Sequence, residues 1–124
     1  MTKKLAVNGQ AQAAHLVKGQ QAEDFACDYL ITQGLSLITR NYRARCGEID
    51  LIMLDDATLV FIEVRYRKNN RYGGASASVN YKKQQRIRNT AALYCQKQNC
   101  DYPSRFDVCA IHGNMQINWI KQAF

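Results

Sequence analysis

Proline and long apolar runs are scarce in this chain. Pro103 is the only proline among the 124 residues, and no stretch approaches the roughly 18 consecutive apolar residues that a membrane-spanning helix needs. The opening segment, MTKKLAVNGQAQAA, also lacks the apolar core of a secretory signal. These absences argue against a membrane protein, and we expect a cytoplasmic location.

Zinc-binding patterns are absent as well. The five cysteines are odd in number and form no C-x-x-C pair, and the chain contains only two histidines, His15 and His112. In a reducing compartment, cysteines without such spacing are typical of small buried or half-buried thiols. We therefore expect neither a zinc site nor a disulfide.

Acidic residues are outnumbered by basic ones. The 17 Lys and Arg residues against 10 Asp and Glu give a formal net charge of +7. Such an excess favours a polyanionic partner, either nucleic acid or an anionic membrane surface. The length suits a single packed core, so we expect a polar N-terminal leader over residues 1–17 and one domain over residues 18–124.

Hydrophobic periodicity predicts the order helix, three strands, helix, two strands, which is an α/β domain with a central mixed sheet flanked by helices. Apolar residues at three- and four-residue spacing indicate one buried face on each helix. On the first helix this face comprises Ala22, Phe25, Ala26, Tyr29 and Leu30, and on the second Ile87, Ala91, Tyr94 and Cys95. Gly34 supplies the stop expected after the first helix. The polar, glycine-bearing segment from Arg67 to Ser78 is typical of a mobile loop.

Two apolar strands between Gly47 and Arg67 are predicted to fold about a turn at Asp56 and Ala57. Counting outward from that turn places Asp50 opposite Glu63. Residue alternation puts a wholly apolar set on one face of this hairpin, namely Ile49, Leu51, Met53, Val60, Ile62 and Val64. The other face is polar at one end, where it carries Glu48, Asp50, Glu63 and Arg65.

Two opposed carboxylates repel each other and need compensation. A divalent cation would provide it, because Asp50 and Glu63 can both supply oxygen ligands to Mg²⁺ or Mn²⁺. Alternatively Arg65, on the same face and opposite Glu48, could join the two acids in a surface ion-pair network. Spacing alone leaves both interpretations open, because clustered acids mark structural networks as well as active sites.

Four segments in a fixed order cover most of the chain: GQQAEDFACDYLITQGLSLITRNYR, GEIDLIMLDDATLVFIEVRYR, SVNYKKQQRIRNTAALY and RFDVCAI. In these segments the sequence resembles the bacterial YraN-type proteins, which are grouped with the restriction-endonuclease-like and archaeal Holliday-junction-resolvase-like nucleases. The resemblance implies a restriction-endonuclease-like αβββαβ core and metal-dependent hydrolysis of phosphodiester bonds in DNA. It suggests branched or damaged DNA as the substrate class, and a homodimer, since junction-cutting relatives work as dimers.

The nuclease pattern, an Asp followed on the next strand by Glu-x-Lys, falls on Asp50 and on Glu63-Val64-Arg65. An acid of the first helix falls on Glu23. The resemblance implies that Asp50 and Glu63 bind Mg²⁺ or Mn²⁺ with help from the Val64 backbone carbonyl, and that Glu23 supports these ligands or a second metal. The metal would activate water and stabilise charge on the phosphoryl oxygens.

Arg65 is the one departure, because the pattern has lysine there. An arginine side chain stays charged and cannot take a proton from water, although its guanidinium can brace a phosphate. Two functions therefore stay open. One is an active endonuclease with Glu23, Asp50, Glu63 and Arg65 as catalytic residues, and the other is a catalytically inactive nuclease-like domain that binds nucleic acid.

Basic residues of the second helix form the expected nucleic-acid surface: Lys82, Lys83, Arg86 and Arg88. Lys83 and Gln84 lie on or beside the buried ridge, so they can point toward the acids. Arg40, Arg43 and Arg45 are expected to add a second basic patch next to Asp50, which suits a groove that follows phosphates. Asp107 is interpreted as structural, paired with Arg105.

Overall fold

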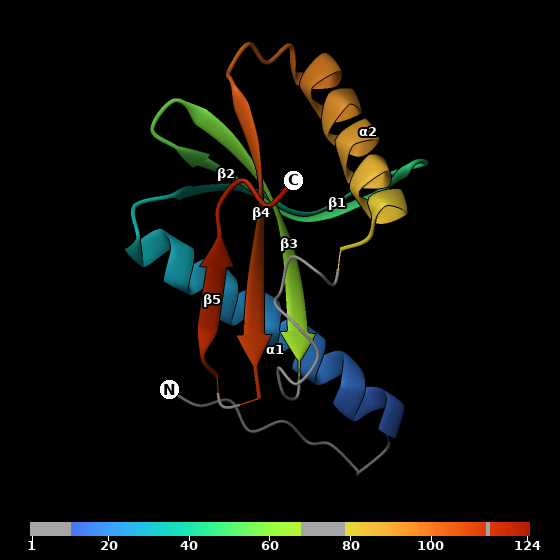
Figure 1. Cartoon of the computed structure of the whole chain (residues 1–124), viewed down its shortest axis with the longest axis vertical. Helices are drawn as coiled ribbons and strands as arrows, with labels where there is room; N and C mark the ends of the chain where they lie inside the picture. Colours follow the sequence, from blue (N-terminus) through green and yellow to red (C-terminus); the bar gives the residue numbers. More distant parts are fainter. Residues whose placement is uncertain (1–10, 68–78, 114) are drawn as a thin grey trace.

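The computed structural model describes residues 11–67, 79–113 and 115–124. Within them the elements follow the expected order (Figure 1): α1 (Ala11–Thr32), β1 (Ser36–Ala44), β2 (Gly47–Asp55), β3 (Thr58–Arg67), α2 (Tyr81–Gln98), β4 (Ser104–His112) and β5 (Ile117–Ile120). This order confirms the α/β class and is consistent with the αβββαβ core that the nuclease resemblance implies. The loop expected after Arg67 lies outside the described residues.

The five strands form one sheet in the order β1-β2-β3-β4-β5. Strands β3 and β4 run parallel, because α2 connects them, and the other neighbouring strands run antiparallel. The sheet is therefore mixed, as predicted. The β2–β3 register runs from Asp55 opposite Thr58 to Leu51 opposite Ile62, which confirms the count from the turn.

Each helix covers one face of the sheet. The buried residues of α1 pack on one apolar set, which includes Leu51, Met53, Val60 and Ile62. The buried residues of α2 pack on the other, which includes Ile52, Leu59 and Phe61. Figure 1 shows α1 crossing behind β3, β4 and β5, with α2 beside the β1–β2 hairpin. All the residues predicted for the inward helix faces belong to these two clusters, so the helix patterns are confirmed.

The helix ends show how sequence sets the boundaries. Helix α1 begins at Ala11, so residues 11–17, which we expected in the polar leader, belong to the helix. It ends at Thr32, and Gly34 follows with φ 103°, a left-handed conformation that favours glycine. Helix α2 is capped by Asn80, whose side chain accepts a 2.8 Å hydrogen bond from the Lys83 N–H.

Ile49 does not lie where strand alternation places it. It packs in the α2-side cluster rather than with Leu51 and Met53 on the α1 side. The β1–β2 register is the same on both sides of this point, but the Asn41–Asp50 pair is missing from it, and Asn41 of β1 has φ 53°, which is not an extended conformation. The strand therefore turns locally at Asp50, and the simple period of two fails there.

A structural ion-pair network fastens β4 to its neighbours. Asp107 is fully buried, and its carboxylate accepts hydrogen bonds from Arg105, from the Trp119 indole N–H and from the Gln122 backbone N–H. Arg105 also contacts Asp55 at 3.2 Å. The predicted Asp107–Arg105 pair is therefore confirmed, and it lies apart from the Asp50 region.

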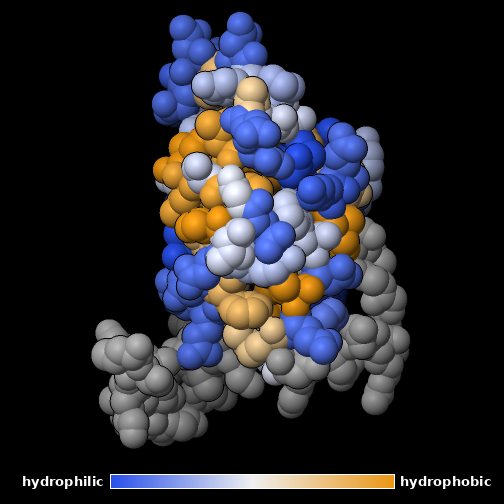
Figure 2. Space-filling view, turned by 90° about the vertical axis from the view of Figure 1, so that its left-hand side faces the viewer, coloured by the Kyte–Doolittle hydropathy of each residue, from blue (hydrophilic) through white to orange (hydrophobic). Residues whose placement is uncertain are grey.

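The surface of the described residues mixes hydrophobic and hydrophilic side chains. On the face seen in Figure 2, hydrophobic residues gather in separate patches between hydrophilic ones. No described helix is long and apolar enough to cross a bilayer. All five cysteines are free thiols, and they are buried (Cys27 and Cys109) or half-buried (Cys46, Cys95 and Cys100).

Candidate active site

Strands β2 and β3 separate at the two acids, Asp50 and Glu63. Their pairing ends at Leu51 and Ile62, one residue before the acids, while β3 continues to pair with β4. Figure 1 shows β3 and β4 continuing together while the β1–β2 hairpin swings across toward α2. We call this point of separation the fork.

The Asp50 carboxylate occupies the fork in place of a strand partner. Its Oδ2 accepts a 2.8 Å hydrogen bond from the Val64 backbone N–H. A buried amide that loses its ladder acceptor needs another, and Asp50 supplies it. The hydrogen bond holds Asp50 against the segment Glu63–Val64 that the sequence pattern singles out.

Glu63 is buried at the fork, with 6% of its surface exposed. Its Oε2 lies 3.2 Å from Arg65 Nη1 and 3.1 Å from Lys83 Nζ. Arg65 follows on the same strand, whereas Lys83 comes from the first turn of α2. The ion pair between Arg65 and Glu63 that the sequence suggested is therefore present, and Lys83 joins it. Glu48, expected opposite Arg65, pairs instead with Arg43 at 3.3 Å.

The pKa of Asp50 is raised from 3.8 to about 7. Burial is the largest cause, and the nearby Glu63 carboxylate is the second. Glu23 adds to the rise, while the Val64 hydrogen bond and the Lys83 ammonium oppose it. Negative charge at the fork is therefore only partly compensated, although Lys83 and Arg65 are close.

Glu23 lies on the α1 side of the fork. Its Oε1 is 3.5 Å from Arg40 Nη2, which is also 2.8 Å from Asp24 Oδ1. Arg40 therefore ties β1 to α1, on the face of the sheet away from α2. The expectation that Arg40 shares a basic patch with Arg43 and Arg45 is wrong, because the strand directs it to the acids of α1.

The fork offers a set of hard oxygen donors. Across residues 11–67, 79–113 and 115–124, no three His, Cys, Asp or Glu side chains gather closely enough to hold a metal ion. A cation at the fork would therefore rely on Asp50, Glu63, a backbone carbonyl and water. Mg²⁺ and Mn²⁺ accept such oxygen-rich shells and often keep several waters, so the donors fit these ions.

The basic residues of α2 divide between two flanks of the helix. Arg86 borders Gly47 of β2, at the β1–β2 turn. Arg88 lies about 200° around the helix from Arg86, and its guanidinium stands over the rings of Phe106 and Phe124 at 5.0 and 5.4 Å. Arg86 and Arg88 therefore do not lie on one common surface of the helix.

Lys82, Lys83 and Gln84 occupy the start of α2. Lys82 is exposed, and Lys83 reaches Glu63 as its position beside the buried ridge predicts. The Gln84 side-chain amide donates to the Val79 carbonyl oxygen at 2.9 Å, so that group is engaged at the helix start. Nucleic-acid binding by these residues, and by Arg43, Arg86 and Arg88, stays a prediction.

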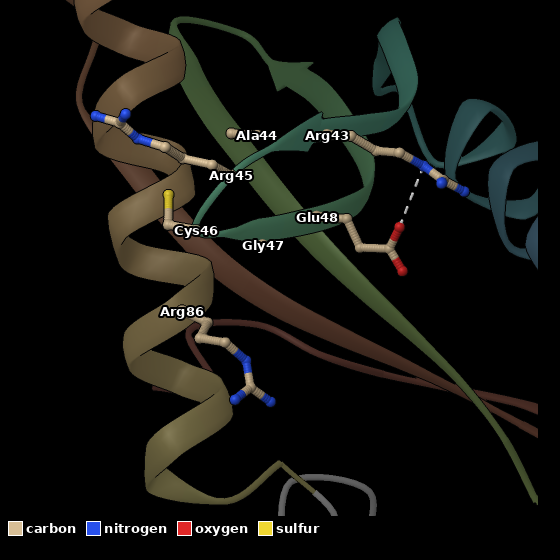
Figure 3. Close-up of a pocket in the computed structure, with 7 residues that line it drawn as sticks. All are labelled: Arg43, Ala44, Arg45, Cys46, Gly47, Glu48 and Arg86. Carbon is tan, nitrogen blue, oxygen red and sulfur yellow. Dashed lines mark ion pairs between the residues drawn. The ribbon is translucent and has the colours of Figure 1, made fainter.

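A shallow hollow of about 360 Å³ lies beside the fork (Figure 3). It is lined by Arg43, Ala44, Arg45, Cys46, Gly47, Glu48 and Arg86, and we call it the arginine hollow. Sequence reasoning found its arginines, but it placed Glu48 opposite Arg65 rather than beside Arg43, and it missed the packing of the turn on α2. Gly47 was the available signal, because a glycine between Cys46 and Glu48 indicates a close backbone approach.

Fold and site together define a small α/β domain with a buried Glu63 and a half-buried Asp50 at a strand fork, and basic residues around them. The family model described as "Uncharacterised protein family UPF0102" matches residues 22–111, and the chain belongs to this family.

Similar proteins from several bacteria match most of this chain. A UPF0102 protein of Pseudomonas syringae pv. tomato is 47% identical over 116 residues, covering 86% of this chain and 91% of that protein. One from Nitrosomonas europaea is 49% identical over 109 residues, covering 86% and 92%. One from Pseudomonas putida strain W619 is 44% identical over 119 residues, covering 91% and 97%.

Proposed function

We propose that this chain is a metal-dependent DNA endonuclease whose active site is the fork. The observation that carries the proposal is the half-buried Asp50 beside the buried Glu63, with the pKa of Asp50 raised to about 7. A fold stabilised for its own sake gains nothing from two acids of like charge side by side, one buried and one half-buried. Strongly perturbed acids at one locus are a mark of functional sites.

Asp50 and Glu63 would hold Mg²⁺ or Mn²⁺, with the Val64 carbonyl beside them. Such an ion activates water and stabilises charge on a transferring phosphoryl group. The hydrogen bond from the Val64 N–H orients the Asp50 carboxylate. Glu23, on the α1 side, adds negative charge at the fork and supports cation binding from outside the ligand set.

Lys83 supplies the ammonium group that the nuclease pattern places at position 65. Its Nζ and Arg65 Nη1 contact the same oxygen of Glu63, at 3.1 and 3.2 Å. In this proposal Arg65 binds phosphate through its bidentate guanidinium, and the Lys83 ammonium positions the attacking water.

A nucleic-acid-binding domain without catalysis is the second candidate function. It is favoured by one observation, the double pairing of Glu63 Oε2 with Arg65 and Lys83, which already neutralises that carboxylate. In this case the basic residues around the fork would bind phosphates, and the acids of the fork would serve the ion-pair network.

Cleavage assays separate the two candidates. Purified protein is incubated with duplex, single-stranded, flap and four-way DNA, with Mg²⁺ or Mn²⁺. An active endonuclease should lose roughly 10²–10³-fold in rate in Arg65→Ala and Lys83→Ala. Glu63→Gln should abolish cleavage, and Arg65→Lys should retain or raise it.

Asp101→Asn, an exposed change in the loop after α2, serves as the matched control and should cut like the wild type. Cleavage that persists equally in Glu63→Gln comes from a contaminant. If the wild type cuts none of the four forms but binds them, the binding domain is the correct interpretation. The preferred form identifies the substrate class, and we propose branched or damaged DNA. We also propose that the chain acts as a homodimer.

A further inference from the structure

The arginine hollow is connected to the fork through two separate elements. Along β2, Glu48 precedes Asp50 by two residues, which is about 6.6 Å of extended chain. Along α2, Arg86 follows Lys83 by three residues, about one helical turn. Since Lys83 contacts Glu63, both elements lead from the acid pair directly into the hollow.

Close packing fixes the floor of the hollow. Gly47 has φ 154°, and a Cβ atom there would lie 3.0 Å from Thr90 Oγ1 and 3.4 Å from Arg86 Cβ. The thiol of Cys46 contacts the same Thr90 hydroxyl at 3.5 Å, and that hydroxyl donates to the Arg86 carbonyl oxygen at 2.8 Å. The β1–β2 turn is therefore held against α2, and Arg45 and Arg86 stand at opposite sides of a fixed junction.

The arginine side chains spread around the hollow rather than converge. Figure 3 shows Arg45 and Arg86 extending in different directions, and Arg43 turned toward Glu48. All three arginines are exposed. A compact anion would need guanidinium groups that meet at one point. Spread cations on a concave surface suit a chain of charges, such as successive phosphates of one nucleic-acid strand.

We infer that the arginine hollow binds the phosphate backbone of a nucleic-acid strand next to the fork, through Arg45 and Arg86, and that Glu48 limits its affinity. The inference rests on the proposed function in taking nucleic acid as the ligand. Glu48 places a carboxylate on the path and occupies Arg43 at 3.3 Å. Both effects oppose binding of a polyanion, so loss of the Glu48 charge strengthens it.

Salt-dependent anisotropy with labelled DNA tests the inference, with EDTA present so that no cleavage occurs. Arg45→Ala and Arg86→Ala should each weaken binding roughly five- to tenfold and lower the salt slope by about 0.9, the value for one phosphate contact on duplex. Glu48→Gln should tighten binding about two- to fivefold, because it removes a repelling charge and releases Arg43. This gain cannot arise from misfolding.

Lys97→Ala, at the far end of the same helix, is the matched control, and its affinity should stay close to that of the wild type. Inorganic phosphate should displace DNA no better than sodium chloride at equal ionic strength. Stronger displacement would mean a compact single-anion site and would overturn the inference. Unchanged slopes in Arg45→Ala and Arg86→Ala, or unchanged affinity in Glu48→Gln, would also overturn it.

The two proposals fail in different ways. If the wild type cuts DNA but these variants bind like the wild type, the hollow inference fails and the endonuclease stands. If the variants change binding as expected but no DNA form is cut, the endonuclease fails and the hollow stands as a strand-binding site.

Discussion

Replacement of Asp50 by Asn should stabilise the fold at neutral and alkaline pH. The pKa of Asp50 is 3.8 in an unfolded chain and about 7 in the folded one. The folded state therefore holds a proton that the unfolded state releases, so stability is lost as pH rises from about 4 to 7. Each pH unit in that window corresponds to about 1.4 kcal/mol, which gives a ceiling of about 4 kcal/mol.

Asn removes this loss while keeping the contact that holds the fork. Its side-chain oxygen can accept the hydrogen bond that the Val64 N–H now gives to Asp50. Because Lys83 and solvent reach the fork, we expect a gain of about 1–4 kcal/mol at pH 8 and close to zero near pH 4.

Urea unfolding of wild type and Asp50→Asn at several pH values measures the difference directly. Other titrating groups are common to both proteins and largely cancel. Asp101→Asn, which removes the same charge from an exposed loop, should show no such dependence on pH. A divalent cation should stabilise the wild type at pH 8 by about 1.4 kcal/mol at tenfold excess over its Kd, and should stabilise Asp50→Asn much less.

Two results would refute this reasoning. A difference between the proteins that does not grow with pH would mean that Asp50 ionises in the folded state much as it does in an unfolded chain. A variant less stable than the wild type at pH 8 would mean that the carboxylate is a net stabiliser, as in a structural ion-pair network with Lys83. In either case the acid pair would lose its interpretation as a strained cation site.

The remaining predictions concern the scaffold. Gly47→Ala should destabilise the protein by about 1–3 kcal/mol in chemical unfolding, because the φ of 154° is unfavourable for alanine and the new Cβ meets Thr90 Oγ1 at 3.0 Å. Asp107→Ala should cost about 3–5 kcal/mol, because it leaves Arg105 and the Trp119 indole N–H without their shared acceptor. At temperatures where it stays folded, Asp107→Ala should bind DNA like the wild type in the anisotropy assay.

Local rules could predict the register of the β2–β3 hairpin because this register depends on a single turn. The turn at Asp56 and Ala57 fixes which residues of β2 and β3 face each other, and side-chain alternation then assigns the faces. The same rules failed at Ile49. Its side chain follows a change in β2 where β1 departs from the extended conformation at Asn41, and a sequence pattern within one hairpin carries no information about a neighbouring strand.

The acids of the site could be predicted from spacing, but their cation partners only in part. Lys83 was expected near the acids from its position on the helix ridge. The pairing of Glu48 with Arg43 was not, because it depends on how the β1–β2 hairpin bends away from β3. The separation of Arg86 from Arg88 was predictable, since residues two positions apart on a helix point about 200° apart around its axis. Counting basic residues without that angle hides the difference.

The arrangement of charge at the fork supports our proposal that a cation binds there. Lys83 and Arg65 both contact the same oxygen, Oε2 of Glu63, whereas the carboxylate of Asp50 is held by a neutral backbone N–H. A network built for stability would distribute its cation contacts over both acids, as the single Arg105 does with Asp55 and Asp107. Here both direct ion pairs fall on Glu63, Lys83 only partly offsets the rise at Asp50, and the pKa of Asp50 stays raised. The same protein thus contains a balanced acid–arginine network and an unbalanced one, and we propose the unbalanced one as the cation site.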